Sequence, residues 1–224
     1  MQQQKSKKIL LYIFLFLMIG TLNNKNISAS NFAEIKKINI DGLNDLRKLD
    51  LLKEFDLLKF NNLFFLDRIK VSKILSSNEL IDKFSVYKNY PSTLNIKIQK
   101  AKFVAKIKKD ENLFFLGTNG KLIKSIKENY DVPYIFGDLN YDSFFELKKK
   151  IDNSNFDYNK IKNLFFFKSG RWDIETKSGI LIKLPKSNLE RSIELVVDIL
   201  NKNIQTKIYK IDIRQNDQVI IDER

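Results

Sequence analysis

The chain has 224 residues, of which 43% are hydrophobic and 30% charged, a balance typical of a folded protein and not of a disordered one. Its formal charge is +13, and it contains neither Cys nor His. Disulfides and thiolate metal sites are therefore excluded, and zinc binding and acid–base catalysis lose their commonest side chains. We predict no catalytic residue, no metal site and no cofactor.

An uncharged apolar run follows Lys5, Lys7 and Lys8 near the N-terminus, and its members are Ile9, Leu10, Leu11, Tyr12, Ile13, Phe14, Leu15, Phe16, Leu17, Met18, Ile19, Gly20, Thr21 and Leu22. Basic residues stay on the cytoplasmic side, so the remaining chain is expected across the membrane. Fourteen residues are few for a span and fit the apolar region of a cleavable signal, with small residues for cleavage at 28–30. The segment alone leaves an anchor and a signal peptide as alternatives.

The pattern of apolar, capping and turn residues in 35–100 predicts the element order strand, helix, helix, strand, strand. Alternating apolar residues at 35–40 indicate a half-buried strand, and Asn44 or Asp45 is placed to cap the following helix. Asp67 is expected to cap a second, short helix. The last two strands are the alternating segments 83–88 and 93–99, joined by a turn at 89–92.

The region after residue 100 is rich in predicted strands. A helix capped by Asp142 and a clearer helix beginning at Ser187 or Asn188 interrupt them. The alternation and turn residues predict strands at 103–107, 112–116, 122–123, 171–176, 180–184, 207–214 and 218–221, and residues 132–137 form a run closed by Gly.

The tetrapeptide Asn-Leu-Phe-Phe occurs three times, beginning at Asn62, Asn112 and Asn163. A spacing near 50 residues could indicate a repeat array, but the flanking residues share nothing. We interpret the copies as coincidental and as core residues on different elements.

Several segments, taken in order, resemble the FtsQ/DivIB family. The resemblance rests on the hairpin at 86–98 around Tyr90-Pro91, the strand at 101–105 followed by Gly120, and the segments 132–137, 170–174 and 211–214. The sequence departs from the family pattern at Phe103, where Pro is usual, at 118–120, where the usual turn is D-x-G, and at Gln215, where an aromatic is usual.

The resemblance implies an α+β fold with a single N-terminal transmembrane helix. It divides the chain into a cytoplasmic tail at 1–8, an anchor at 9–24, a POTRA domain (β-α-α-β-β) at 33–100, and a mixed β domain with a long C-terminal helix at 101–224. It favours the anchor over the cleaved signal. The implied location is the cell inner membrane, single-pass, with the bulk of the chain in the periplasm and enriched at the division septum.

The resemblance also implies a non-catalytic, essential scaffold that links early and late parts of the division machinery by binding FtsB and FtsL. The expected mode is addition of a partner strand to an unpaired edge near the C-terminus. Arg214 is the expected specific contact, because guanidinium pairs bidentately with carboxylates, whereas Trp172 is expected mainly in the core. The candidate partner-binding residues are Trp172, Ile211, Ile213, Arg214, Gln215 and Asp217.

Three other functions were weighed. A nucleic-acid binder would gather its charge, preferably as Arg, but only six of the 40 basic residues are Arg and Lys is dispersed, so we expect no nucleic-acid partner. An exported hydrolase would need a catalytic motif, and no G-x-S-x-G is present, so we expect no small-molecule substrate. A secreted POTRA-containing chaperone or transport accessory remains the alternative.

Overall fold

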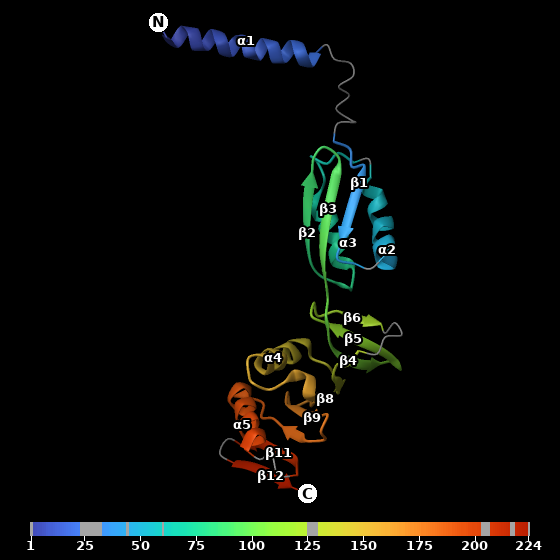
Figure 1. The fold of residues 1–224 in the computed structure, drawn as a ribbon, viewed down its shortest axis with the longest axis vertical. Helices are drawn as coiled ribbons and strands as arrows, with labels where there is room; N and C mark the ends of the chain where they lie inside the picture. The colour runs from blue at the N-terminus through green and yellow to red at the C-terminus, as the bar shows by residue number, and fades with distance from the viewer. Residues whose placement is uncertain are drawn as a thin grey trace. The chain divides into compact units, whose positions relative to one another are not determined.

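The computed structural model describes residues 2–22, 33–43, 45–59, 61–124, 130–202, 207–215 and 218–223 (Figure 1). Helix α1 (Gln2–Leu22) contains residues 9–22 of the predicted anchor, and residues 23 and 24 lie outside the described residues. Within this described part of the chain, no helix combines the length and the apolar character needed to cross a membrane. The chain divides into two compact units, Met1–Lys100 and Ala101–Arg224.

The described part of the first unit contains a three-stranded sheet in the order β1-β3-β2, in which β1 runs parallel and β2 antiparallel to β3. The alternation of β3 buries Leu94, Ile96 and Ile98 against the two helices. Its elements are β1 (Lys37–Asp41), α2 (Asp45–Phe55), a 3-10 turn η1 (Asp56–Leu58), α3 (Arg68–Ser77), β2 (Ile81–Asn89) and β3 (Thr93–Lys100).

The second unit is built on a sheet that has nine strands in the described residues, in the order β12-β11-β10-β9-β8-β7-β4-β5-β6. Its strands are β4 (Phe103–Lys109), β5 (Asn112–Gly117), β6 (Leu122–Lys124), β7 (Tyr134–Phe136), β8 (Ile161–Phe166), β9 (Trp172–Thr176), β10 (Leu181–Lys183), β11 (Ile208–Gln215) and β12 (Gln218–Glu223). The helical elements are α4 (Tyr141–Asp152), a 3-10 turn η2 (Tyr158–Lys160) and α5 (Leu189–Lys202).

Helices α4 and α5 supply the core of the second unit together with one face of the sheet (Figure 1). Phe144 of α4 and Ile193 of α5 are buried against the apolar row formed by Ile174, Ile182 and Ile211 on three adjacent strands. Residues directly opposite in a sheet share a face, so this row identifies the inner face. The side chains of the alternate row face away from the helices.

Two capping predictions had different outcomes. Asp67 caps α3 as expected, because its Oδ1 accepts hydrogen bonds from the backbone amides of Ile69 at 2.8 Å and Lys70 at 3.4 Å. Asp142 was the wrong residue for α4, where the cap is the Asn140 side chain, which accepts from the Ser143 amide at 2.9 Å. Asp142 lies in the first turn, where a carboxylate favours the helix dipole without capping.

The Asn-Leu-Phe-Phe copies lie on three different elements, as predicted. The second copy lies on β5 and buries Phe115, and the third lies on β8, an unpredicted strand, and buries Leu164. The first copy lies in the turn before α3, where Phe64 is 50% and Phe65 87% exposed. The core interpretation was therefore wrong for these two side chains, whereas Leu63 of the same copy is fully buried in the core of the first unit.

Gly137 lies where the segment after β7 packs closely against β8. It has a φ of +98°, and a Cβ at this position would overlap the Phe166 carbonyl, whereas Gly179 has a φ of +86° with nothing within 4 Å of its Cβ position. We expect Gly179→Ala to cost about 1–2 kcal/mol of unfolding free energy from backbone strain, and Gly137→Ala at least about 3 kcal/mol. Urea unfolding of the detergent-solubilised chain, followed by fluorescence of its single Trp, Trp172, would measure both. Equal losses would contradict the close packing.

Candidate functional site

The last strand in the described residues, β12, is an edge of the nine-stranded sheet. It pairs with β11, and no other strand among the described residues contacts its outer side. An edge strand presents unpaired N–H and C=O groups, which can accept another strand. The site predicted for a partner strand therefore has a physical counterpart in residues Gln218–Glu223, which we call the C-terminal edge.

The inner side of the C-terminal edge is hollowed between β12 and α5. The cavity there has a volume of about 570 Å³, and its lining includes Leu195 of α5, Ile213 and Gln215 of β11 and Val219 of β12. Leu195 and Val219 are each 40% exposed. Because side chains of an added strand alternate between faces, every second one would meet these apolar groups.

On the outer face of the sheet, which points away from the helices, the C-terminal edge carries Ile220. This side chain is 47% exposed and lies opposite Asp212 in the pairing of β12 with β11. The same register continues across the sheet through directly opposed residues. The resulting row on the outer face is Ile220, Asp212, Lys183, Asp173, Phe165 and Phe136. A partner strand beside β12 would therefore meet an apolar side chain backed by a charged cluster.

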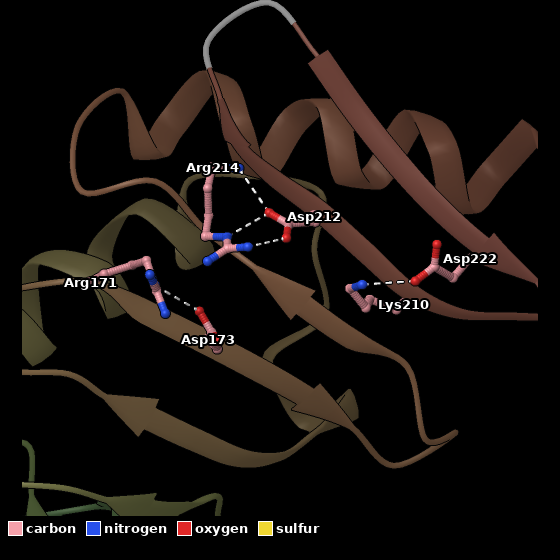
Figure 2. Close-up of polar contacts among 6 residues, drawn as sticks. All are labelled: Arg171, Asp173, Lys210, Asp212, Arg214 and Asp222. Atoms are coloured by element: carbon pink, nitrogen blue, oxygen red, sulfur yellow. Dashed lines mark hydrogen bonds and ion pairs between the residues drawn. The ribbon is translucent and has the colours of Figure 1, made fainter.

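Arg214 and Asp212 form an ion pair on β11, the strand next to the C-terminal edge (Figure 2). The Arg214 guanidinium donates from Nε to Oδ1 at 2.8 Å and from Nη2 to Oδ2 at 2.6 Å, a bidentate geometry. The Asp212 side chain is 8% and the Arg214 side chain 40% exposed. Hydrogen bonds from Arg214 hold the pKa of Asp212 below its ordinary value of 3.8.

A second carboxylate, Asp173, lies across β10 from Asp212 and is also buried. Its Oδ1 accepts from Nε of Arg171 at 3.2 Å (Figure 2). Burial raises the pKa of Asp173 above its ordinary value of 3.8, against the opposing charges of Arg171, Lys183 and Arg214. The two aspartates and their basic neighbours thus form one connected charged cluster on the outer face.

The edge strand is also held to β11 by an ion pair on the same face. Nζ of Lys210 donates to Oδ2 of Asp222 at 2.7 Å, and the two residues are opposite each other in the register (Figure 2). Both side chains are about one-third exposed or less. This contact helps to hold β12 against β11. The N–H and C=O groups along the other edge of β12 remain open to a partner strand.

Three of the predicted partner-binding side chains lie in the core. Ile211 is 0%, Ile213 4% and Trp172 1% exposed, and Trp172 donates from Nε1 to Oγ of Ser143 at 2.8 Å. The predicted strand 207–214 corresponds to β11, which is paired on both sides and has its apolar residues facing the helices. The core position of Trp172 agrees with the main expectation for it, Ile211 is fully buried and Ile213 lines the cavity beside β12, so direct contact of these side chains with a partner stays a prediction.

The remaining candidates differ in their positions. Gln215 is exposed at the end of β11 and lines the cavity beside α5, while Arg214 is partly exposed but paired with Asp212. Asp217 lies outside the described residues. Sequence reasoning placed a strand at 218–221 but did not assign binding to it, although its apolar run 219–221 after a predicted turn was a visible signal for Val219 and Ile220. Leu195 on α5 was also missed.

No group of three or more His, Cys, Asp or Glu residues suited to holding a metal ion occurs in the parts of the chain that the structure describes.

Comparison with known families gives two adjoining matches. The model of the POTRA domain, FtsQ-type, matches residues 33–100, and that of the cell division protein FtsQ/DivIB, C-terminal, matches residues 105–214. The chain belongs to the FtsQ/DivIB family. The second match ends at Arg214, so the C-terminal edge of this FtsQ/DivIB chain lies beyond it.

Curated FtsQ/DivIB relatives cover most of the chain at low identity. The cell division protein FtsQ of Rickettsia bellii is 24% identical over 85% of this chain and 72% of its own length. FtsQ of Rickettsia typhi is 26% identical over 84% of this chain and 71% of its own length. The cell division protein DivIB of Bacillus subtilis is 22% identical over 54% of this chain and 46% of its own length.

The Arg214–Asp212 pair gives a pH-dependent prediction for this FtsQ/DivIB chain. Because Arg214 lowers the folded pKa of Asp212, the pair stabilises fully above the ordinary value of 3.8 and is lost as pH falls through the lower folded pKa. Arg214→Gln leaves a buried carboxylate without its cation, at a cost of about 1–3 kcal/mol at neutral pH. The difference in the free energy of unfolding between the wild type and the variant should therefore become smaller below about pH 4.

Urea unfolding at several pH values, followed by Trp172 fluorescence, measures that difference. The control is the double variant Arg214→Gln with Asp212→Asn, in which no unpaired carboxylate is left at position 212. Its difference in unfolding free energy from the wild type should not become smaller at low pH in the same way. A difference between the wild type and Arg214→Gln that stays constant between pH 7 and pH 3 would show that the pair does not act through the charge of Asp212.

Proposed function

We propose that the chain is an essential, non-catalytic scaffold of the bacterial division machinery that binds FtsB and FtsL at the septum. Support comes from the two family matches, which together span residues 33–100 and 105–214, and from relatives named as cell division proteins. The proposal assigns the interaction to the second unit. The observation that carries it is the C-terminal edge, an unpaired strand with exposed apolar side chains on both of its faces.

The proposed binding step is addition of a partner strand along β12. Backbone hydrogen bonds would supply affinity, and the alternating side chains would supply specificity. On the inner side the partner would meet Val219 and Leu195, and on the outer side Ile220. Gln215 and the exposed part of Arg214 would contact its polar groups at the end of β11, and Asp217 is proposed to extend this contact. Trp172, Ile211 and Ile213 contribute by holding β9 and β11 in place.

The proposed arrangement in the cell has four parts. Residues 1–8 form a cytoplasmic tail, 9–24 a single inner-membrane anchor, 33–100 the POTRA domain and 101–224 the β domain, with both domains in the periplasm. Three Lys residues precede an apolar segment free of charge, which supports this orientation. The anchor would keep the C-terminal edge near the septal membrane, where membrane-bound partners meet it at high effective concentration.

Depletion of the protein tests the function as a whole. Cells that lose it should elongate into filaments without septa, because late division components would no longer be recruited. Microscopy measures cell length, and re-expression of the full chain is the control. Normal division after depletion would rule out the scaffold role.

Fractionation of the same cells separates the scaffold from a secreted accessory protein. The full chain should stay in the membrane fraction. A soluble periplasmic form with a mature start near Asn31 would contradict the anchor and favour the secreted alternative.

Ile220→Lys tests the C-terminal edge directly. Burial of an isoleucine on binding is worth about 1.5–3 kcal/mol, so the variant should bind a purified FtsB–FtsL complex at least about tenfold more weakly. Leu49→Lys on α2 is a matched control, since Leu49 is 55% and Ile220 47% exposed. Calorimetry or biolayer interferometry measures both affinities. Unchanged binding by Ile220→Lys would place the partner elsewhere.

Arg214→Glu is a poor choice for the same purpose. A carboxylate at position 214 would face the buried Asp212 and lie near Asp173, so it would destabilise the sheet through repulsion and loss of the ion pair. Lost binding in that variant could then come from unfolding. Ile220 avoids this ambiguity because its side chain is exposed.

A further inference from the structure

The turn before α3 and the first turn of α3 expose the two most solvent-accessible large apolar side chains outside α1 among the described residues. Phe65 is 87% and Ile69 80% exposed. Phe64 and Tyr90 lie beside them, each about half exposed, with ring centroids 4.6 Å apart in a stacked arrangement. We call Phe64, Phe65, Ile69 and Tyr90 the aromatic tip. Apolar side chains gathered in this way on a soluble surface indicate contact with another apolar phase.

Basic side chains surround the aromatic tip. Arg68 and Lys73 share a face of α3 with Ile69, where they line one shallow hollow, and Nζ of Lys88 donates to the Phe64 carbonyl at 3.1 Å. The neighbouring acid Asp67 is engaged in capping α3 through two backbone amides. Aromatic rings with a fringe of Lys and Arg are the composition that favours an anionic membrane interface.

The aromatic tip lies at the end of the first unit that the chain reaches from its N-terminal segment. The Leu63 amide donates to the Ala33 carbonyl at 2.6 Å, and the Ile35 amide donates to the Asn61 carbonyl at 3.0 Å. Residues 33–35 therefore pack directly against the turn that carries Phe64 and Phe65. Ten residues lie between Leu22 and Ala33, so the two are at most about 40 Å apart along the chain.

We propose that the aromatic tip docks onto the outer leaflet of the membrane that holds the N-terminal anchor, with anionic phospholipid as its ligand. The inference rests on the proposed anchor, which brings this end of the unit within reach of the bilayer. Phe65 and Ile69 enter the boundary between headgroups and acyl chains, and Arg68 and Lys73 contact lipid phosphates. This docking restricts the orientation of the first unit on the membrane.

A groove is also present near the tip, and Tyr90 of the tip is among its lining residues. A cavity of about 550 Å³ between β2 and α3 is lined by Val71, Phe84, Val86 and their neighbours, but neither Phe65 nor Ile69 lines it. A bound peptide in that cavity would leave the two most exposed side chains in water. A lipid surface covers protruding side chains without needing a complementary groove, so it accounts for them better.

The absence of Cys from the sequence allows a direct test with single-cysteine labels. The full chain is reconstituted into vesicles of phosphatidylethanolamine and phosphatidylglycerol, with an environment-sensitive fluorophore on Phe65→Cys or Ile69→Cys. Lys83→Cys is the control, because Lys83 is exposed on the same unit, at the other end of β2, about 20 Å from the hairpin. The fluorescence emission of the labels at 65 and 69 should shift to shorter wavelengths and should be quenched by nitroxide lipids. The emission of the label at 83 should do neither.

Charge reversal tests the anionic ligand. A basic side chain near an anionic surface changes binding about fivefold, so Arg68→Glu with Lys73→Glu should lower the ratio of docked to undocked tip by at least about 25-fold. Lys83→Glu with Lys100→Glu is the matched control, since both residues are exposed at the far end of β2 and β3. The reversal should have no effect in phosphatidylcholine vesicles, where docking is already weak.

The outcomes separate this inference from the proposed function. If the chain leaves the vesicles after an alkaline wash, the anchor fails and the docking proposal fails with it. If the chain stays in the vesicles but the labels at 65 and 69 remain as aqueous as the label at 83, docking is overturned while the anchor stands. That second result would favour a protein partner for the tip.

Discussion

Backbone hydrogen bonding is the constraint from which the proposed function follows. A strand inside a sheet satisfies its N–H and C=O groups on both sides, but an open sheet must end in two strands that cannot. In the described part of the second unit these are β6 and β12. The strand β6 has three residues, whereas β12 has six and exposes Val219 and Ile220. The longer edge with apolar side chains on both faces is the better template for another strand.

The charged cluster beside the edge shows how a conspicuous residue can be committed to structure. Arg214 is well suited to recognise a partner carboxylate, yet it forms a bidentate pair with Asp212 on its own strand. Asp212 is buried, and a buried carboxylate without a cation would cost more than the pair gains. Arg214 therefore stabilises the fold, and any role that it has in binding is combined with this structural role. A substitution of the exposed Ile220 on the neighbouring strand separates binding from stability better.

The aromatic tip of the first unit and the C-terminal edge of the second are two separate surfaces with different chemistry. The edge offers backbone groups in a row, which suits a polypeptide. The tip offers protruding rings and basic side chains, which suit a lipid interface. If both proposals hold, the same chain binds a bilayer through its first unit and a protein strand through its second. A membrane-bound scaffold needs both kinds of contact.

The sequence alone determined most elements of the fold, because period-2 alternation and cap residues are local signals. The hairpin of β2 and β3, the cap Asp67 and the strand holding Trp172 were all readable in this way. The strand β8 was missed because its apolar residues show no clear alternation and its partners, β7 and β9, are chosen by the tertiary fold. The family resemblance was also present in the sequence, in the order of its segments.

Only the tertiary structure decided which side chains can meet a partner. Exposure depends on which strands lie beside one another, and the sequence pattern of β11 is the same whether it is an edge or an interior strand. Ile211 and Ile213 are core residues because their side chains face the helices, and the pairing of β12 with β11 moves the sheet edge to the strand that carries Val219 and Ile220. In the same way, the copies of Asn-Leu-Phe-Phe bury Phe115 on β5 and Leu164 on β8 but expose Phe64 and Phe65 in the turn before α3.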